Sequence, residues 1–432
     1  MDRVCVIGIW HLGSVYSACL ADFGYQVTGV DTDTERVDNL NNGIPPLFEP
    51  GLEELIAANI KAGRLKYTTD IEHTVCDCPY VMIAFDTPVD DNDEVDLSPV
   101  INTCQRIAPC LKNGCVLIIS SQVPVGTSEN IRAMIKKDNP ALDFDVVYCP
   151  ENLRLGKAIA YYKKPDRIVI GADSEATLDK VEKFFSVIPA PVMRMDLKSA
   201  EMTKHALNAF LATSISFGSE IANICDEVGA DAMKVAQALR SESRIGNGIP
   251  LLPGLGFAGG TLARDLKILK KAGSDNKYET LLIDSVFTVN QRQNGIVIRK
   301  LERIFGSLKG LNIGVLGITY KPGTSTLRRS SSLEIIAELI KKGAKVKAFD
   351  PKADRNEVKQ HIEFEFCADA YAVAENSDAL VLITEWQEFK ELDYNRIKEV
   401  MKKPILIDAK NMLDMYKMKT LGFSYLGIGR GE

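Results

Sequence analysis

Two segments of the sequence repeat one pattern: an apolar strand, a glycine turn, a helix, and a second strand that ends on an aspartate. The first segment, residues 4–31, ends on Asp31, and the second opens at Leu311 and ends its second strand on Asp350. A strand, a helix and a strand in this order pack as parallel neighbours of one sheet. Further apolar, strand-like runs follow each segment. The pattern predicts an α/β fold with two Rossmann-like, doubly wound domains.

A helical stretch separates the two halves. From Ser199 to about Val228, apolar residues recur at steps of three and four, namely Met202, Leu207, Phe210, Leu211, Ile215, Ile221 and Ile224. A helix of this length needs packing on both sides, so we expect it to connect the halves. We also expect its stretch from Phe210 to Ile224 to lie in the interface of a homodimer. The expected division is a Rossmann domain over residues 1–198, a central helical region over 199–300 and a Rossmann-like domain over 301–432.

Charge and hydropathy exclude several classes of protein. The 432 residues carry a net charge of −6, and Lys and Arg are scattered, so no basic stripe indicates binding to nucleic acid or to an anionic membrane. No run of about 20 apolar residues predicts a membrane span. The N-terminus enters an apolar strand at once, without the basic start of a signal peptide. We therefore expect a cytoplasmic protein with a small-molecule ligand.

Cysteine and histidine positions give no sign of a metal site. Ten cysteines are scattered along the chain, and Cys76 and Cys78 lack the CxxC spacing of a zinc or redox pair. The four histidines are not spaced as a pair of ligands. We expect no metal, and we interpret most thiols as small, reduced core residues.

The first glycine turn has the position of a dinucleotide-binding fingerprint. The pattern G-x-G-x-x-G is occupied by Gly8, Ile9, Trp10, His11, Leu12 and Gly13, so a tryptophan replaces the middle glycine. Asp31 stands at the end of the second strand, where a carboxylate accepts hydrogen bonds from the adenosine ribose. Because an acid there repels a 2′-phosphate, the sequence favours NAD over NADP. A strand–helix–strand unit that packs without a nucleotide is the alternative.

Six stretches in order along nearly the whole chain resemble the UDP-glucose/GDP-mannose dehydrogenase family. They read "VDTDTERVDNLNNGIPPLFEPGL", "PVGT", "PENLRLGKA", "EMTKHALNAFLATSISFGSEIANICDEVG", "GITYKPGTSTLRRS" and "ITEW". The resemblance implies an N-terminal NAD-binding domain, a helical dimerisation region and a C-terminal nucleotide-sugar-binding domain. It also implies oxidation of a sugar primary alcohol to a carboxylate in two NAD-dependent steps. In the family, a cysteine captures the intermediate aldehyde, and a thioester forms and is hydrolysed.

The resemblance implies four residues of the hydride-transfer machinery. Lys204 and Asn208 lie four apart on one helical face and match the family residues that stabilise an oxyanion at the reacting carbon. Asp265 matches the aspartate that holds and deprotonates water or the alcohol, and Glu151 matches an active-site glutamate. A solvent-exposed lysine and a helix-capping aspartate are the alternative interpretation of Lys204 and Asp265.

The residues for thioester chemistry differ from the family pattern. Where the family has G-F-G-G-S-C-F-P-K-D, residues 256–265 place Thr261 at the nucleophile and Arg264 at a lysine. Gln122 replaces a threonine near the water, and Leu155 replaces a second glutamate. A hydroxyl is far less acidic than a thiol and leaves poorly. These losses indicate a change of reaction, unless Cys149 has taken over as the nucleophile.

The remaining ligand contacts are also expected from the resemblance. Besides the glycine turn and Asp31, the expected cofactor-binding residues are Arg36, Thr87, Gln122 and Arg328. The expected contacts to a nucleotide sugar, most simply a UDP-hexose, are Asn152, Leu153, Arg154, Arg244, Gly254, Gly256, Phe257, Gly260 and Lys321. Surface salt bridges are the alternative for the charged members of this set.

Three hypotheses follow for the function. The first is an NAD-dependent nucleotide-sugar oxidoreductase that stops after two electrons, or that oxidises transiently and recycles the cofactor. The second is a four-electron 6-dehydrogenase that forms a uronate without a thioester. The third is a non-catalytic protein that binds a nucleotide sugar or NAD.

Overall fold

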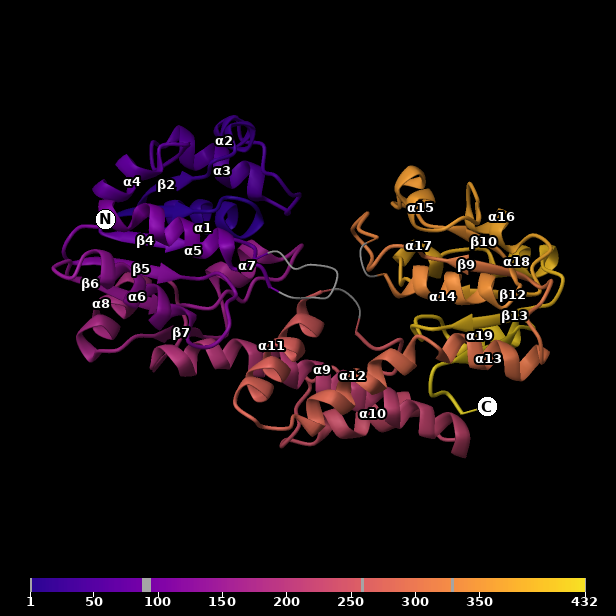
Figure 1. The fold of residues 1–432 in the computed structure, drawn as a ribbon. Coiled ribbons are helices and arrows are strands. Elements are labelled where there is room, and N and C mark those ends of the chain that lie inside the picture. Colours follow the sequence, from indigo (N-terminus) through magenta and orange to yellow (C-terminus); the bar gives the residue numbers. More distant parts are fainter. Residues whose placement is uncertain (1, 88–94, 258–259, 328–329, 432) are drawn as a thin grey trace. The chain divides into compact units, whose positions relative to one another are not determined.

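The structure is a computed structural model that describes residues 2–87, 95–257, 260–327 and 330–431 (Figure 1). The chain forms two compact units, Met1–Leu207 and Asn208–Glu432. The boundary falls within the long helix α9 (Leu197–Val228), which confirms the helix expected from Ser199 to Val228. The division into three domains at residues 198 and 300 stays a prediction.

The described part of the first unit contains one sheet, in the order β3-β2-β1-β4-β5-β6-β7-β8. Only the pairing of β6 with β7 is antiparallel among the described strand pairs. Its strands are β1 (Arg3–Ile7), β2 (Gln26–Val30), β3 (Leu65–Thr68), β4 (Tyr80–Ile83), β5 (Cys115–Ile119), β6 (Phe144–Tyr148), β7 (Ile168–Gly171) and β8 (Val192–Met195).

Helices cover both faces of this sheet. Val4 and Val6 of β1 belong to the core that includes Leu20, whereas Cys5 and Ile7 belong to the core that includes Ile131. This alternation is the doubly wound arrangement that the sequence predicts. The helices are α1 (His11–Asp22), α2 (Thr34–Asn41), α3 (Leu52–Lys61), α4 (Ile71–Asp77), α5 (Ser98–Ile107), the 3-10 helix η1 (Ala108–Cys110), α6 (Thr127–Asp138), α7 (Ala158–Lys163) and α8 (Glu175–Phe185).

The second unit begins with helices. A small core joins Ala212 of α9 to Leu266 and Val286, which lie on two following helices. A buried ion pair, 2.8 Å between Lys300 Nζ and Asp226 Oδ2, fastens α9 to a third helix. These helices are α10 (Ala232–Ser241), α11 (Thr261–Asp275), α12 (Leu281–Gln293) and α13 (Ile296–Phe305).

The second sheet is parallel throughout its described pairs, in the order β11-β10-β9-β12-β13-β14. It lies in the orange and yellow part of Figure 1. Its strands are β9 (Asn312–Leu316), β10 (Lys345–Phe349), β11 (Glu365–Phe366), β12 (Ala379–Leu382), β13 (Ile405–Asp408) and β14 (Ser424–Gly427). The helices around it are α14 (Ser331–Lys341), α15 (Arg355–His361), α16 (Ala370–Ala374), α17 (Gln387–Lys390), α18 (Tyr394–Val400) and α19 (Met415–Thr420).

The first six strands of the first sheet and the six of the second follow the same order, with β1 and β9 at corresponding places. In both, the strand order reverses between the first strand and the fourth, and ligands of such sheets bind at that reversal, beyond the carboxyl ends of the strands. Of the helices in the described ranges, none combines the length and the apolar character needed to cross a membrane.

Candidate active site

The turn after β1 requires glycine at two positions. Gly8 has φ +88°, and a Cβ atom there would lie 2.7 Å from Cδ1 of Phe85. A Cβ atom at Gly13 would lie 1.9 Å from the carbonyl oxygen of Gly8. Trp10, at the middle position of the fingerprint, has φ −73°, so this position is not in the left-handed region that favours glycine. Its side chain is 44% exposed.

Asp31 follows β2 and fixes the glycine turn. Its Oδ2 accepts hydrogen bonds from the backbone N–H of Ile9 at 3.1 Å and from Nη1 of Arg36 at 2.8 Å. A pocket of about 180 Å³ beside it is lined by Trp10, Asp33, Glu35, Arg36, Asn39, Ile44, Pro45 and Pro46. A buried carboxylate at the end of the second strand, an arginine and an apolar wall fit the adenosine end of a dinucleotide.

Thr87 and Gln122, two of the other expected cofactor residues, lie in the same unit. Thr87 Oγ1 donates a hydrogen bond to the carbonyl oxygen of Gln122 at 3.0 Å, and both residues are buried. Leu12 N–H donates to Oδ2 of Asp86 at 3.1 Å. Arg328 lies outside the described residues.

Glu49 is a buried residue that sequence reasoning did not single out. Its Oε2 accepts from Gly156 N–H and its Oε1 from Ala158 N–H, both at 2.8 Å. His11 Nε2 lies 3.2 Å from Oε2 of the same carboxylate. Glu49 therefore joins the start of α1 to the turn that follows residues 152–155. The only signal was its place in the motif "LFEPGL", which carries no indication of these contacts.

Lys204 and Glu151 form a close pair in the first unit. Lys204 Nζ lies 2.9 Å from Oε1 of Glu151 and 2.6 Å from its carbonyl oxygen, and the lysine side chain is only 7% exposed. Leu153 N–H donates to the other carboxylate oxygen of Glu151 at 2.9 Å. These oxygens compensate the loss of water around the buried ammonium group of Lys204. Lys204 is therefore no solvent-exposed helix residue.

The neighbouring expected residues are more accessible. The guanidinium of Arg154 stacks on the ring of Tyr161 at 4.5 Å from its centroid. Asn152 Nδ2 donates a long bond of 3.4 Å to the carbonyl oxygen of Pro150, and Leu155 is 40% exposed.

Cys149, just before these residues, does not have the character of a nucleophile. The side chain is buried, and burial raises the pKa of its thiol to about 12. A reactive thiol needs a lowered pKa and access to solvent. This geometry disfavours the alternative in which Cys149 replaces the missing cysteine.

Asn208 and Asp265 form a second close pair, within the second unit. Asn208 Nδ2 donates to Oδ2 of Asp265 at 2.5 Å, and Asp265 is fully buried at the fifth position of the helix that begins at Thr261. Lys204 and Asn208 are four residues apart in α9, which is one helical turn.

The glycine-rich loop before α11 is held by α12. Asn290 Oδ1 accepts from Phe257 N–H at 2.8 Å, and its Nδ2 donates to the Phe257 carbonyl oxygen at 3.1 Å. Gln293 Nε2 donates to the carbonyl oxygen of Gly254 at 2.6 Å. Gly256 has φ +79°, and a Cβ atom there would lie 2.3 Å from Oδ1 of Asn290. Sequence reasoning missed Asn290 and Gln293, because polar residues on a helix usually face water.

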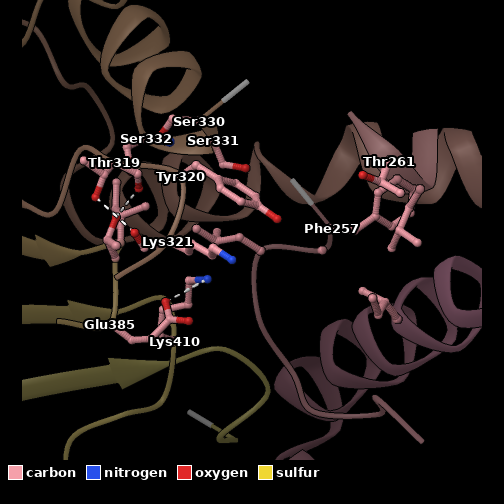
Figure 2. Close-up of a pocket in the computed structure, with 16 residues that line it drawn as sticks. Phe257, Thr261, Thr319, Tyr320, Lys321, Ser330, Ser331, Ser332, Glu385 and Lys410 are labelled. Carbon is pink, nitrogen blue, oxygen red and sulfur yellow. Dashed lines mark hydrogen bonds and ion pairs between the residues drawn. The ribbon is translucent and has the colours of Figure 1, made fainter. Parts of the chain in front are cut away.

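A cavity of about 290 Å³ in the second unit lies between this loop and the carboxyl ends of β9, β12 and β13 (Figure 2). Figure 2 shows Thr261 and Phe257 on one side of it and Thr319, Lys321, Glu385 and Lys410 on the other. Lys410 Nζ lies 3.0 Å from Oε2 of Glu385. The described lining is Ile215, Leu255, Gly256, Phe257, Thr261, Leu262, Thr319, Tyr320, Lys321, Ser330, Ser331, Ser332, Ile383, Thr384, Glu385 and Lys410.

The chemistry of this cavity suits a phosphorylated ligand. Two lysines and seven hydroxyl side chains line it, and α14 begins there with the positive end of its helix dipole. Cysteine is absent from its described lining, and Thr261 is the first residue of α11, where a cysteine would be activated by the helix N-terminus. Lys321, Gly256, Phe257 and Thr261 thus line one cavity, and their roles toward a ligand stay predictions.

Arg244 lies elsewhere. Its side chain is 85% exposed, and its Nε lies 3.1 Å from Oε1 of Glu242. Gly254 and Gly260 are loop residues next to the described lining, and Gly259 lies outside the described residues.

Asp350, the counterpart of Asp31, is also a buried carboxylate that accepts hydrogen bonds. Its Oδ2 accepts from the N–H of Ile318 at 2.8 Å, from both the N–H and the hydroxyl of Thr319 at 2.9 Å and from Nε1 of Trp386 at 3.1 Å. Its Oδ1 accepts from two further backbone N–H groups. Both oxygens are occupied by the protein, as are those of Asp31, whose Oδ1 accepts from Asp33 N–H at 3.2 Å. Asp350 therefore stabilises the turn after β9 as Asp31 stabilises the turn after β1.

Comparison with known proteins identifies the family. Three models of the UDP-glucose/GDP-mannose dehydrogenase family match the chain: the NAD binding domain at residues 2–188, the central domain at 198–292 and the UDP binding domain at 314–415.

Relatives match along the whole length. The UDP-glucose 6-dehydrogenase TuaD of Bacillus subtilis is 37% identical over 433 residues, which cover 100% of this chain and 94% of that protein. The UDP-glucose 6-dehydrogenase of Rhizobium meliloti is 37% identical over 438 residues, covering 100% of both. The structure of a UDP-glucose dehydrogenase from Pyrobaculum islandicum superimposes with a TM-score of 0.88 at 28% identity, over 99% of this chain and 98% of that one. The chain belongs to the UDP-glucose/GDP-mannose dehydrogenase family and is an NAD-dependent oxidoreductase of nucleotide sugars.

Proposed function

We propose that the protein oxidises the hexose of a UDP-sugar with NAD and stops after two electrons, or oxidises transiently and returns the hydride to give an epimer. The relatives named UDP-glucose 6-dehydrogenases support the substrate class. The observation that carries the two-electron limit is Thr261, at the first turn of α11 and at a cavity whose described lining holds no thiol.

In this proposal, the residues of α9 and their partners move one proton and stabilise one charge. The alcohol loses a proton and a hydride, and NAD, when bound, would supply the hydride acceptor. The ammonium of Lys204, held by Glu151, stabilises the negative charge that develops on the sugar oxygen. The Asn208–Asp265 pair orients the alcohol, and the Asp265 carboxylate takes up its proton.

The step that would follow in a four-electron enzyme needs a covalent intermediate. A thiolate adds to the aldehyde and leaves readily from an acyl group, whereas a threonine alkoxide is formed rarely and leaves poorly. Cys149 does not supply the thiol, because its pKa is raised to about 12 by burial. We therefore infer that an aldehyde formed from a primary alcohol is released. An epimer forms only where a secondary alcohol is oxidised to a ketone and the hydride returns to the opposite face of that carbon.

A second candidate is a four-electron dehydrogenase that oxidises the hydrated aldehyde directly, with Asp265 and Glu151 as bases. The full-length identity of 37% to proteins named UDP-glucose 6-dehydrogenases favours it. A non-catalytic role is the third hypothesis, and the buried Lys204–Glu151 and Asn208–Asp265 pairs argue against it, since ligand binding alone gives no reason to bury them.

The decisive experiment counts electrons. UDP-hexoses are incubated with the protein and NAD, NADH is measured per sugar consumed, and product masses are recorded. We expect one NADH and a loss of two hydrogens, or an epimer without net NADH. Lys204→Ala and Asp265→Asn should lower the rate by about two orders of magnitude or more.

The variants Thr261→Ala and Thr261→Ser separate the candidates, because only serine keeps the hydroxyl. We expect both to keep most of the activity. A uronate with two NADH per sugar that disappears in Thr261→Ala and persists in Thr261→Ser would overturn the proposal, because the hydroxyl would then be the nucleophile. A uronate formed equally by all three proteins would establish the second candidate.

We also propose that the protein is a homodimer joined along α9. Phe210, Phe217 and Ile224 are spaced by seven residues and are 57%, 48% and 52% exposed, and Val228 is 70% exposed. Residues seven apart lie on one face of a helix. An exposed apolar stripe of this kind on a soluble protein indicates an interface, and a second copy supplies an identical stripe.

A further inference from the structure

Asp86 places a carboxylate at the start of α1. It lies three residues beyond the end of β4, and its Oδ2 accepts the hydrogen bond of Leu12 N–H at 3.1 Å. α1 itself has no acidic residue in its first turn, and its N-cap residue Trp10 makes no capping bond with its side chain. Asp86 therefore supplies the negative charge that the helix N-terminus attracts.

The same N–H group belongs to the turn that receives the pyrophosphate of a dinucleotide. In such strand–helix–strand units, the pyrophosphate lies at the N-terminus of the first helix, against the glycine turn. Gly8 and Gly13 build that turn here, and Asp31 with its pocket lies at the adenosine end. A carboxylate and a pyrophosphate cannot both accept the Leu12 N–H, and their charges repel each other.

We propose that Asp86 is a specificity-determining residue of the cofactor site: its carboxylate occupies the pyrophosphate position in the cofactor-free protein and must leave when NAD binds. This inference rests on NAD as the cofactor of the proposed function. It predicts that the wild type binds NAD more weakly than a variant without the Asp86 carboxylate does. It also predicts that only ligands with phosphate groups compete with Asp86.

The test compares ligands with and without phosphate. Calorimetry measures the Kd of NAD, of ADP-ribose and of adenosine for the wild type, Asp86→Asn and Asp86→Ala. Removing the negative charge of Asp86 should lower the Kd of NAD and of ADP-ribose by roughly tenfold. Asn keeps an oxygen that can accept from Leu12 N–H, so the charge effect is seen without loss of the cap. Adenosine affinity should change by less than about twofold, because adenosine brings no negative charge.

A matched control is Asp70→Asn. Asp70 also caps a helix of the first unit, with its side chain accepting from His73 N–H, and it is no part of the glycine turn. Its substitution should leave all three affinities unchanged. Thermal unfolding of every variant shows whether the fold is retained.

Two results would overturn the inference. NAD affinity that is equal or weaker in both Asp86 variants would mean that the carboxylate does not compete. If the Kd of adenosine fell as much as the Kd of NAD, the effect of Asp86 would lie outside the pyrophosphate position. Failure of the proposed function looks different: a wild type that converts no UDP-sugar, whatever the affinities for NAD are.

Discussion

Asn290 is predicted to hold the substrate loop by two hydrogen bonds to one residue. Its amide accepts from Phe257 N–H and donates to the Phe257 carbonyl oxygen, at 2.8 and 3.1 Å. Asn290→Ala removes both bonds from a backbone that is largely shielded from water. Each is worth about 0.5–1.5 kcal/mol, so the ordered loop loses about 1–3 kcal/mol, or roughly 5- to 150-fold in population.

The assay is steady-state kinetics at varied UDP-sugar, with NAD saturating. Because the loop lines the cavity through Gly256, Phe257 and Thr261, we expect KM for the sugar to rise by about the fold-change above. Limited proteolysis should cut the loop faster. Asn276→Ala is the control, since Asn276 donates to the Ala272 carbonyl oxygen at the exposed end of α11. An Asn290→Ala enzyme with unchanged KM and unchanged cleavage would refute the reasoning.

A second variant probes the same contact from the other side. Gly256→Ala places a Cβ atom 2.3 Å from Oδ1 of Asn290 and also strains a backbone at φ +79°. Asn290→Ala removes the clash and leaves the strain, so the double variant should be better than the sum of the two single losses predicts. Strict additivity would show that the two residues do not meet.

Three further predictions concern the cofactor, the assembly and the thiols. NAD should bind at least about tenfold more tightly than NADP. In calorimetry, Asp31→Ala should reduce this difference in affinity, because the carboxylate no longer repels a 2′-phosphate. Equal affinities of the wild type for NAD and NADP would exclude a role of Asp31 in cofactor selection. The wild type should be a dimer in light scattering, and Phe217→Glu should give monomers because a charge would enter the centre of the apolar stripe; a monomeric wild type at micromolar concentration contradicts the interface. With its pKa raised to about 12, Cys149 has about one thiolate in ten thousand thiols at pH 8. Alkylation of the native protein should therefore leave Cys149 unmodified in mass spectrometry, whereas the denatured protein should be alkylated there. Rapid labelling of native Cys149 would make it a candidate nucleophile again.

The repeated strand–helix–strand pattern predicted both sheets, and the steps of three and four predicted α9. Patterns of this kind report which face of an element is buried, and burial decides the fold. They do not report where a polar side chain finds its partner. Asp31 and Asp350 end corresponding strands and both accept hydrogen bonds from the following turn, yet only Asp350 also accepts from a tryptophan and only Asp31 from an arginine.

The site was predicted unevenly for the same reason. Lys204, Asn208 and Asp265 were predicted from the family motifs, and the structure gives each a close partner, although their catalytic roles stay predictions. Glu49, Asn290 and Gln293 were missed, because their partners are backbone groups far away in the sequence. A partner 107 residues away, as for Glu49 and Gly156, leaves no local pattern.

That separation also sets an order of events on the ribosome. The strand, turn and helix around Gly8 are complete when the first thirty or so residues have emerged, but Glu49 acquires its backbone donors only after Ala158 has been made. At about 5–20 residues per second, the delay from Glu49 to Gly156 is roughly 5–20 s. A carboxylate is not buried without partners. During synthesis, Glu49 therefore stays hydrated until residues 156–158 have been made. Until then, the start of α1 lacks its connection through Glu49 to those residues.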